Sequence, residues 1–119
     1  MGVKVLGVFR ASTDTREVPA GGVVFEAGTV GDEMFGVAEG QIELRFPDGR
    51  VLPVGPDETF GELALIDSTP RAATAVAVED SKLAVIDKRR FLFLVTETPV
   101  FALQVMSSLA ERLRGATGT

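Results

Sequence analysis

The sequence of 119 residues contains no cysteine and no histidine. Without cysteine the chain has no disulfide, no thiolate nucleophile and no zinc ribbon. Without histidine it has no Ser-His or Cys-His catalytic pair and no ordinary imidazole metal site. Tryptophan and tyrosine are also absent. These absences lead us to expect no catalytic residues, no metal and no cofactor.

The charge balance is acidic, with 12 basic and 17 acidic residues and a net charge of −5. A chain of this charge lacks the basic footprint of proteins that bind nucleic acid non-specifically, so we expect no direct nucleic-acid binding. No apolar run approaches the length of a membrane span, and the N-terminus lacks the charged region and long apolar core of a signal peptide. We therefore expect a cytoplasmic protein without membrane contact.

Short β-type runs separated by glycine and proline fill the chain from Thr15 to Ile86. The clearest turn is Pro47-Asp48-Gly49, which joins two alternating runs into a hairpin. Many short strands at nearly even spacing favour a closed or double-sheet antiparallel architecture. The predicted runs span residues 15–18, 23–26, 34–38, 41–46, 50–54, 73–78 and 82–86.

The period of the pattern changes to helical after Ile86. Asp87 can cap a helix over residues 88–97, and Thr98 can cap a second one with Pro99 in its first turn. Gly115 is the expected end of that second helix. The chain of 119 residues has the length of a single domain, with strands over 15–86 and helices over 87–114.

The stretch from Phe60 to Ala75 carries the chemistry. Gly61 opens a short apolar helix whose free N–H groups favour an anion, and Arg71 can grip the same anion. Glu62 would repel an anion, but it can accept hydrogen bonds from hydroxyls beside it. Anion and hydroxyls together indicate a sugar phosphate or a nucleotide. The alternative is an ordinary surface ion pair between Glu62 and Arg71.

The residues of this stretch resemble the phosphate-binding cassette of the cyclic nucleotide-binding domain family. The resemblance covers nearly the whole chain from Thr15 to Arg114. Its first landmark is a glycine pattern in the strands, with Gly28, Gly31 and Gly40. Its more specific landmark is the cassette within residues 60–75, Phe60-Gly61-Glu62-Leu63-Ala64-Leu65 and Pro70-Arg71-Ala72-Ala73-Thr74.

The resemblance implies an antiparallel β-roll, mainly β and jelly-roll-like, with a short phosphate-binding helix and C-terminal helices. It also implies that Arg71 binds the cyclic phosphate and that Glu62 accepts the ribose 2′-hydroxyl. Relatives that prefer cyclic GMP often carry a hydroxyl residue at the position of Ala72, so cyclic AMP is the expected ligand and cyclic GMP the alternative. The other implied ligand-binding residues are Gly61, Leu63, Ala64, Ala73, Leu44 and Val51.

Two departures from the family's pattern affect how the protein is expected to pass on the ligand signal. The helix that usually precedes the roll is short or missing, and the sequence ends soon after the last helix without an effector domain. We therefore expect a stand-alone sensor that acts on an unknown downstream protein. The chain has no tryptophan or tyrosine to cover the purine. The residue that serves as a lid over the purine can therefore be Leu109, Arg112, Leu113 or a residue of the tail.

The last helix carries an apolar stripe with four-three-four spacing, formed by Ala102, Met106, Leu109 and Leu113. One face should cover the roll and the rest can pair with a second copy, which predicts a homodimer. Two other hypotheses remain beside the sensor. The chain can be an interaction module that keeps the roll without a ligand, or a cupin-like enzyme, which the lack of histidine disfavours.

Overall fold

The computed structural model describes residues 5–117, and the side chains of the last helix as far as Leu113. Residues 1–4, where no signal peptide is expected, lie outside this part. The described elements are β1 Thr15–Val18, β2 Val23–Phe25, β3 Glu33–Glu39, β4 Ile42–Arg45, β5 Val51–Val54, β6 Thr59–Phe60, α1 Glu62–Asp67, β7 Thr74–Ala77, β8 Ser81–Asp87, α2 Lys88–Glu97 and α3 Val100–Thr117.

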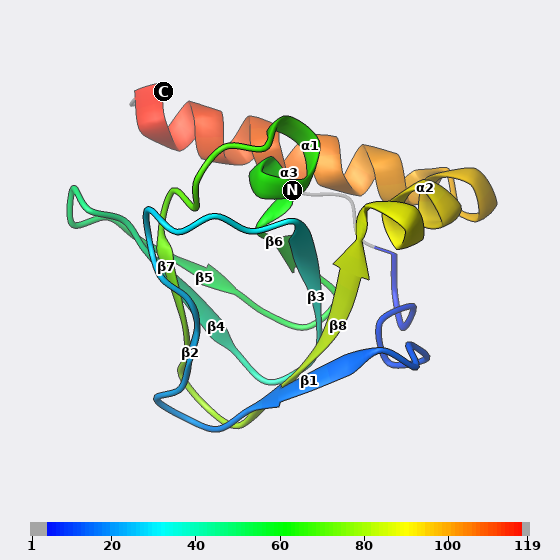
Figure 1. The fold of residues 1–119 in the computed structure, drawn as a ribbon, viewed down its shortest axis with the longest axis horizontal. Helices are drawn as coiled ribbons and strands as arrows, with labels where there is room; N and C mark the ends of the chain where they lie inside the picture. The colour runs from blue at the N-terminus through cyan, green and yellow to red at the C-terminus, as the bar shows by residue number, and fades with distance from the viewer. Residues whose placement is uncertain (1–4, 118–119) are drawn as a thin grey trace.

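Two four-stranded antiparallel sheets face each other. Their strand orders are β1-β8-β3-β6 and β2-β7-β4-β5. Figure 1 shows α3 running across one end of this roll, with α1 close to it and the β4–β5 hairpin projecting to one side. The predicted antiparallel roll with C-terminal helices is therefore confirmed. The predicted hairpin is present as well, with Leu44 opposite Leu52 and Gly49 at a φ of 95°.

The core has two parts because β3 and β8 are covered on both faces. Side chains alternate between the two faces of a strand, so Phe35 and Val37 point into the roll, whereas Met34 and Ala38 point toward the helices. All four are at most 1% exposed. The inner part holds the two sheets together, and the outer part seats α2 and α3 on the first sheet.

The segment before β1 forms turns over residues 6–11, with no helix in its described part. The pattern left this segment open between a short helix and an extended lead-in. Phe9 is nevertheless 2% exposed and packs edge-on against Phe101, with ring centroids 6.4 Å apart. A Cβ on Gly36 would lie 2.5 Å from Phe9 Cε1, so this glycine makes room for the ring.

The C-terminal helices follow the predicted boundaries in part. Asp87 caps α2 as expected, accepting a hydrogen bond from the backbone N–H of Arg90 at 2.8 Å. Thr98 instead ends α2, with its N–H donating to the carbonyl of Leu94, and α3 begins at Val100. Gly115 does not end α3, because its backbone stays helical and the helix continues to Thr117.

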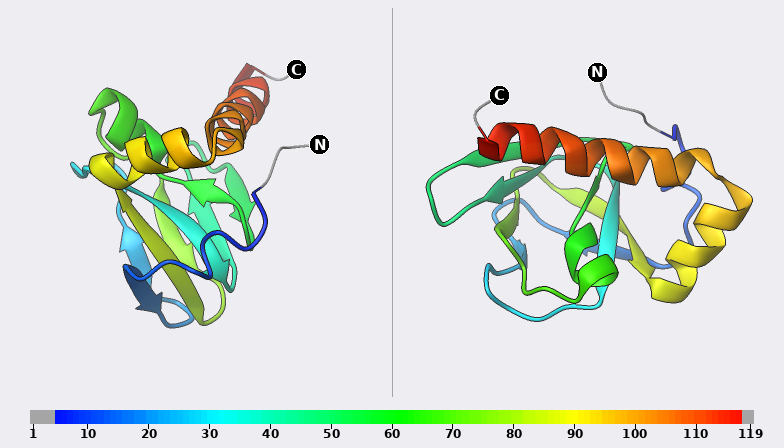
Figure 2. Two further views of the ribbon diagram at one scale, coloured as in Figure 1. Left: turned by 90° about the vertical axis from the view of Figure 1, so that its right-hand side faces the viewer. Right: turned by 90° about the horizontal axis from the view of Figure 1, so that it is seen from above.

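The face of α3 that covers the roll differs from the predicted stripe. Phe101, Gln104 and Val105 are at most 2% exposed, whereas Met106 and Leu113 are 56% and 65% exposed. Figure 2 shows α2 and α3 as the two arms of an angle over the sheets. Within residues 5–117 no single helix meets the length and hydropathy of a membrane span, and the bent pair α2 and α3 meets them only together.

Candidate functional site

The chain turns sharply between β6 and α1 at Gly61. This residue has a φ of 82° and serves as the N-cap of α1 without a side-chain hydrogen bond. A side chain here would be strained, and its Cβ would lie 2.9 Å from Arg71 Nη1. Glycine is thus required by the backbone and by the close approach of Arg71. The first N–H groups of the helix are left without partners inside it.

Arg71 is buried beside this turn, with 7% of its surface exposed. Its Nη1 donates to the carbonyl of Gly61 at 3.0 Å, and its Cζ lies 4.2 Å from the centroid of the Phe25 ring. Burial lowers the pKa of Arg71, while the nearby carboxylates of Glu33 and Asp32 raise it in part. Since arginine stays protonated in proteins, the site holds a fixed, largely desolvated positive charge.

Glu62 follows Gly61 and is completely buried. Its Oε1 accepts from Arg112 Nη1 at 2.7 Å, and Arg112 Nη2 donates to the carbonyl of Thr59 at 2.9 Å. The other oxygen, Oε2, is buried and finds no hydrogen-bond partner among the described residues. The alternative of a surface ion pair between Glu62 and Arg71 is therefore wrong, because both side chains are buried and each has a different partner.

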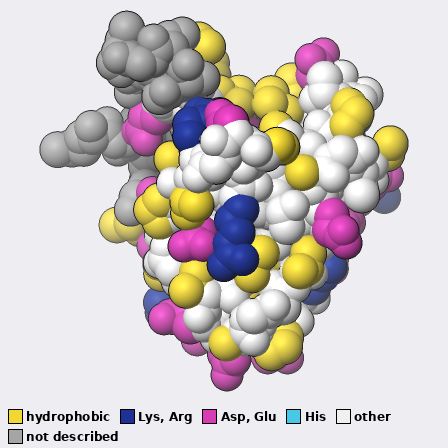
Figure 3. All heavy atoms as spheres, turned by 90° about the vertical axis from the view of Figure 1, so that its left-hand side faces the viewer, with side chains coloured by type: hydrophobic (Ala, Val, Ile, Leu, Met, Phe, Trp, Pro, Cys, Tyr) yellow, Lys and Arg dark blue, Asp and Glu magenta, His cyan; other side chains and the backbone are white. Residues whose placement is uncertain are grey.

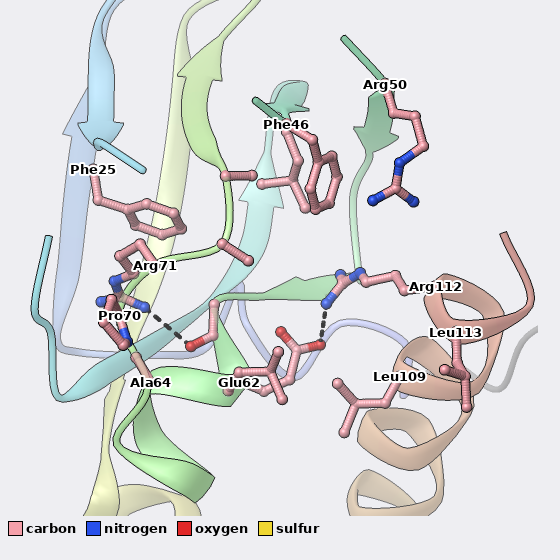
Figure 4. Close-up of a pocket in the computed structure, with 15 residues that line it drawn as sticks. Phe25, Phe46, Arg50, Glu62, Ala64, Pro70, Arg71, Leu109, Arg112 and Leu113 are labelled. Atoms are coloured by element: carbon pink, nitrogen blue, oxygen red, sulfur yellow. Dashed lines mark hydrogen bonds and ion pairs between the residues drawn. The ribbon is translucent and has the colours of Figure 1, made fainter. Parts of the chain in front are cut away.

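Figure 4 shows Arg71, Glu62 and Arg112 along one cavity, with Phe46 and Arg50 at another part of its wall. The cavity has a volume of about 410 Å³, within the usual range for small-molecule sites. Helix α3 contributes the side chains of Leu109, Arg112 and Leu113 to its wall, three of the candidates for the lid over the purine. The fourth candidate, the tail, lies outside the described side chains. The lining residues are Phe25, Leu44, Phe46, Arg50, Gly61, Glu62, Leu63, Ala64, Pro70, Arg71, Ala72, Ala73, Leu109, Arg112 and Leu113.

The structure brings together eight of the nine predicted ligand-binding residues and leaves out Val51. Leu44 is opposite Leu52, so its side chain points into the roll with 4% exposure. Val51 is opposite Arg45, the residue after Leu44, and is 50% exposed. Because paired residues share a face of the sheet, the side chain of Val51 belongs to the opposite face from that of Leu44.

Sequence reasoning missed several lining residues. In the alternating run over residues 41–46, Phe46 falls on the same side as Leu44, and this signal could have identified Phe46. The Cζ of Arg50 lies 4.5 Å from the centroid of that ring, and its Nε donates to Asp48 Oδ2 at 2.8 Å. The partnership of Glu62 with Arg112 spans 50 residues of sequence and has no local signal.

Charged side chains are mixed on the face of the molecule drawn in Figure 3. Lysine, arginine, aspartate and glutamate are interspersed there with hydrophobic side chains, and the visible described atoms on this face form no broad basic surface. The positive charges at the cavity are those of the arginines in its wall, Arg50, Arg71 and Arg112.

Comparison with known proteins assigns the sequence to one family. A family model described as "Cyclic nucleotide-binding domain" matches residues 15–98. The chain is 35% identical over 106 residues to the cyclic AMP receptor protein of Thermus thermophilus, covering 85% of this chain and 49% of that protein. It is 37% identical over 100 residues to a cyclic nucleotide-gated potassium channel of Rhizobium etli, covering 84% and 28%. The chain thus spans about half the length of these curated relatives or less.

Solved structures agree with this result. One similar structure comes from work on a cyclic-GMP-dependent signalling pathway that regulates bacterial phytopathogenesis. It matches with a TM-score of 0.73 and 38% identity, covering 84% of each chain. The catabolite activator protein of Thermus thermophilus matches with a TM-score of 0.73 and 35% identity, covering 87% of this chain and 51% of that one.

Proposed function

Because this chain belongs to the cyclic nucleotide-binding domain family, we propose that its cavity binds a cyclic nucleotide as a sensor and catalyses no reaction. One observation carries the proposal. A buried guanidinium, that of Arg71, shares the cavity with a buried carboxylate oxygen of Glu62 that has no described partner. This combination suits an anion attached to a hydroxyl-bearing group.

Each part of the ligand has matching chemistry in the wall. Arg71 and the first N–H groups of α1 receive the cyclic phosphate through charge-assisted hydrogen bonds. Glu62 Oε2 accepts the ribose 2′-hydroxyl. Leu44, Phe46 and Leu109 line the same cavity and offer apolar surface to the purine. Leu63, Ala64 and Ala73 contribute backbone groups beside the phosphate and the sugar.

Cyclic AMP is the first candidate ligand, because Ala72 provides no hydroxyl at a position where relatives that prefer cyclic GMP often carry one. The relative named as a cyclic AMP receptor protein supports the same assignment. We expect cyclic AMP to bind more tightly than cyclic GMP.

Cyclic GMP is the second candidate, and Arg50 is the observation that favours it. Its guanidinium lines the cavity next to Phe46 and is held by Asp48. Arginine pairs with the O6 and N7 acceptors of guanine, whereas adenine presents an amino donor in place of O6. The similar structure from a cyclic-GMP-dependent pathway supports this candidate too.

We propose that α3 carries the response to the ligand, because its side chains form part of the cavity wall. Exposed side chains follow α3 with spacing three-four-three, at Leu103, Met106, Ala110 and Leu113, of which Leu113 also borders the cavity. This is the spacing of a two-helix contact and supports a homodimer through α3, with a downstream protein as the further partner. A ligand moves α3 only by its different affinity for the two arrangements.

Calorimetric titration tests the binding function directly. Arg71→Ala removes charge-assisted hydrogen bonds of about 1.5–3 kcal/mol, which corresponds to a roughly ten- to hundred-fold loss of affinity for cyclic AMP or cyclic GMP. Arg89→Ala is the matched control, because Arg89 is an exposed arginine of α2 that does not line the cavity. Equal affinities of wild type and Arg71→Ala would remove Arg71 from the site.

The alternative of an interaction module without a ligand makes a different prediction. Such a module would show no rise in melting temperature with any cyclic nucleotide, whereas a binding domain is stabilised by ligand in excess of its dissociation constant. Sedimentation of wild type and Met106→Lys tests the dimer, since a charge among these exposed side chains of α3 should dissociate it. A monomeric wild type would refute the dimer and leave nucleotide binding untouched.

A further inference from the structure

A second cavity lies on the other side of α3 from the cavity with Arg71. Its volume is about 390 Å³, and its wall is formed by β5, the start of β6 and the C-terminal half of α3. Leu109 and Leu113 border the first cavity, whereas Ser108 and Glu111 point to another side of the helix and border the second. Arg112 borders both, so this part of α3 forms a ridge between the two cavities.

Thr59 turns its side chain toward the second cavity. Phe60 is paired with Phe35 and points into the roll, and neighbouring side chains of a strand point to opposite faces, so Thr59 faces α3. Thr59 is 1% exposed, yet its Oγ1 has no hydrogen-bond partner in the described part of the chain. A buried polar atom without a partner costs free energy, and a molecule in this cavity can supply the missing partner.

The two arginines of the wall already have carboxylate partners outside it. Arg112 is bonded to Glu62 at 2.7 Å, as Figure 4 shows, and Arg50 is bonded to Asp48 at 2.8 Å. Neither of these two carboxylates borders the second cavity. Glu111 borders it and takes part in no ion pair among the described residues. The wall therefore offers acceptor oxygens and little uncompensated positive charge.

Three oxygen-bearing groups are placed around the second cavity. They are the hydroxyls of Thr59 and Ser108 and the carboxylate of Glu111. Ser108 and Glu111 are three residues apart and thus neighbours on α3, and Thr59 lies across from them on β6. Val51 and Pro53 add apolar surface, because their side chains alternate with that of Leu52, which packs against the inner core.

We propose that the second cavity binds a small aliphatic amine in its protonated form. An ammonium group carries a positive charge and three N–H donors, which match the two hydroxyls and the carboxylate of Glu111. Glu58 adds a second carboxylate to the wall, and the aliphatic stem of the amine lies along Val51 and Pro53. A phosphate in this cavity would face the two carboxylates while both arginines are already paired, so an anionic ligand is disfavoured. The inference does not depend on the proposed function, because the amine does not enter the first cavity.

The first experiment compares n-butylamine with 1-butanol, which has the same carbon chain but no charge. Each compound is titrated into the full wild-type chain while the backbone amide resonances are recorded. We expect butylamine to move the resonances of Thr59 and of residues 108–112 in a saturable way. It should bind roughly ten- to a hundred-fold more tightly than butanol, the range of hydrogen bonds to a charged group. No saturable movement with butylamine, or equal affinities of the two compounds, would overturn the inference.

Glu111→Gln removes the charge at an exposed position, where the change cannot disturb the core. The preference for butylamine over butanol should fall by about two- to five-fold, the range of an ion pair that is partly screened by water. Glu97→Gln is the matched control, because Glu97 is an exposed carboxylate of α2 that does not border the cavity. A wild-type preference in Glu111→Gln, or an equal loss in Glu97→Gln, would overturn the inference.

Thr59→Val removes the unpartnered hydroxyl and keeps the shape of the side chain. Without amine, the urea midpoint should not fall, because the hydroxyl has no described partner to lose. The affinity for butylamine should fall by roughly ten-fold, because one ammonium donor loses its acceptor. A lower midpoint would mean that the folded chain already bonds the hydroxyl, and an unchanged affinity would mean that the amine does not contact it. Either result would overturn the inference.

Arg71→Ala separates this site from the proposed nucleotide site. It should weaken cyclic nucleotides and leave the affinity for butylamine unchanged, because Arg71 does not border the second cavity. Resonance changes confined to the surroundings of Arg71 would place the amine in the first cavity and overturn the inference. Movement of the Thr59 resonance with protein concentration alone would assign the second cavity to another copy of the chain, and would overturn it as well.

Discussion

Replacing Gly31 by alanine should displace the Arg71 guanidinium and weaken ligand binding, although Arg71 itself is unchanged. Gly31 lies between β2 and β3, has no positive φ, and therefore tolerates alanine as far as its own backbone is concerned. Its added Cβ would lie 2.7 Å from Arg71 Cζ, where ordinary contacts begin at 3.4 Å. The guanidinium would have to move by on the order of 1 Å, and hydrogen bonds tolerate only a few tenths of an ångström.

The displaced group is the end of a long side chain, so the stability of the fold should change little. We expect the free energy of unfolding of Gly31→Ala to stay within about 1 kcal/mol of wild type. Ligand affinity should fall by roughly ten- to a hundred-fold, because the charge-assisted hydrogen bonds proposed between Arg71 and the phosphate would be misplaced. The Phe25 ring lies 4.2 Å from Arg71 Cζ and limits the space into which the guanidinium can retreat.

Urea denaturation and calorimetric titration with cyclic AMP and cyclic GMP measure the two effects separately. Gly55→Ala is the matched control, because Gly55 also lacks a positive φ, does not line the cavity, and would place its Cβ 3.2 Å from Gln41 Oε1. A folded Gly31→Ala protein with wild-type affinity would refute the role assigned to Arg71 and its position. So would an equal loss of affinity in Gly55→Ala.

Three further changes test other parts of the structure. Phe9→Ala should lower the free energy of unfolding by about 3–5 kcal/mol in urea denaturation, because the ring is 2% exposed; Leu6→Ala, at 78% exposure, should change it by less than about 0.5 kcal/mol. Similar effects of the two changes would contradict the packing of Phe9. Asp87→Ala should cost about 1 kcal/mol in the same assay by removing the cap of α2, and an unchanged midpoint would argue against the cap. Arg50→Leu should weaken cyclic GMP by about 1–3 kcal/mol relative to cyclic AMP in calorimetry, and equal changes for both would remove Arg50 from ligand choice.

The elements of the roll could be predicted because their signals are local. Alternating side chains and the turn at Gly49 specify strands and a hairpin wherever they occur in a chain. The cassette is local as well, since Gly61 and Glu62 are adjacent and Arg71 follows within ten residues. Their association was therefore predictable, although the role of each toward a nucleotide stays a prediction.

The sequence alone does not decide which face of an element is covered. Val51 is one residue out of phase with Leu44 across the hairpin and is 50% exposed. On α3 the apolar pattern left open which face covers the roll, and the helix rests on the roll through Phe101 and Val105. An apolar helix with a broad hydrophobic surface can be rotated about its axis at little local cost. Contacts with the sheet select the rotation, and these contacts come from residues far away in the sequence.

The sequence by itself determined seven of the eight described strands, all except β6, together with the order of the helices and the cassette with Gly61, Glu62 and Arg71. Each of these depends on neighbours within about ten residues. Tertiary structure alone decided the partner of Glu62. Arg112 reaches this carboxylate across 50 residues, and the pairing exists only because α3 is laid along the cavity and excludes water from the carboxylate. A buried charge pairs with whichever opposite charge the tertiary structure places next to it, and no local sequence pattern specifies that residue.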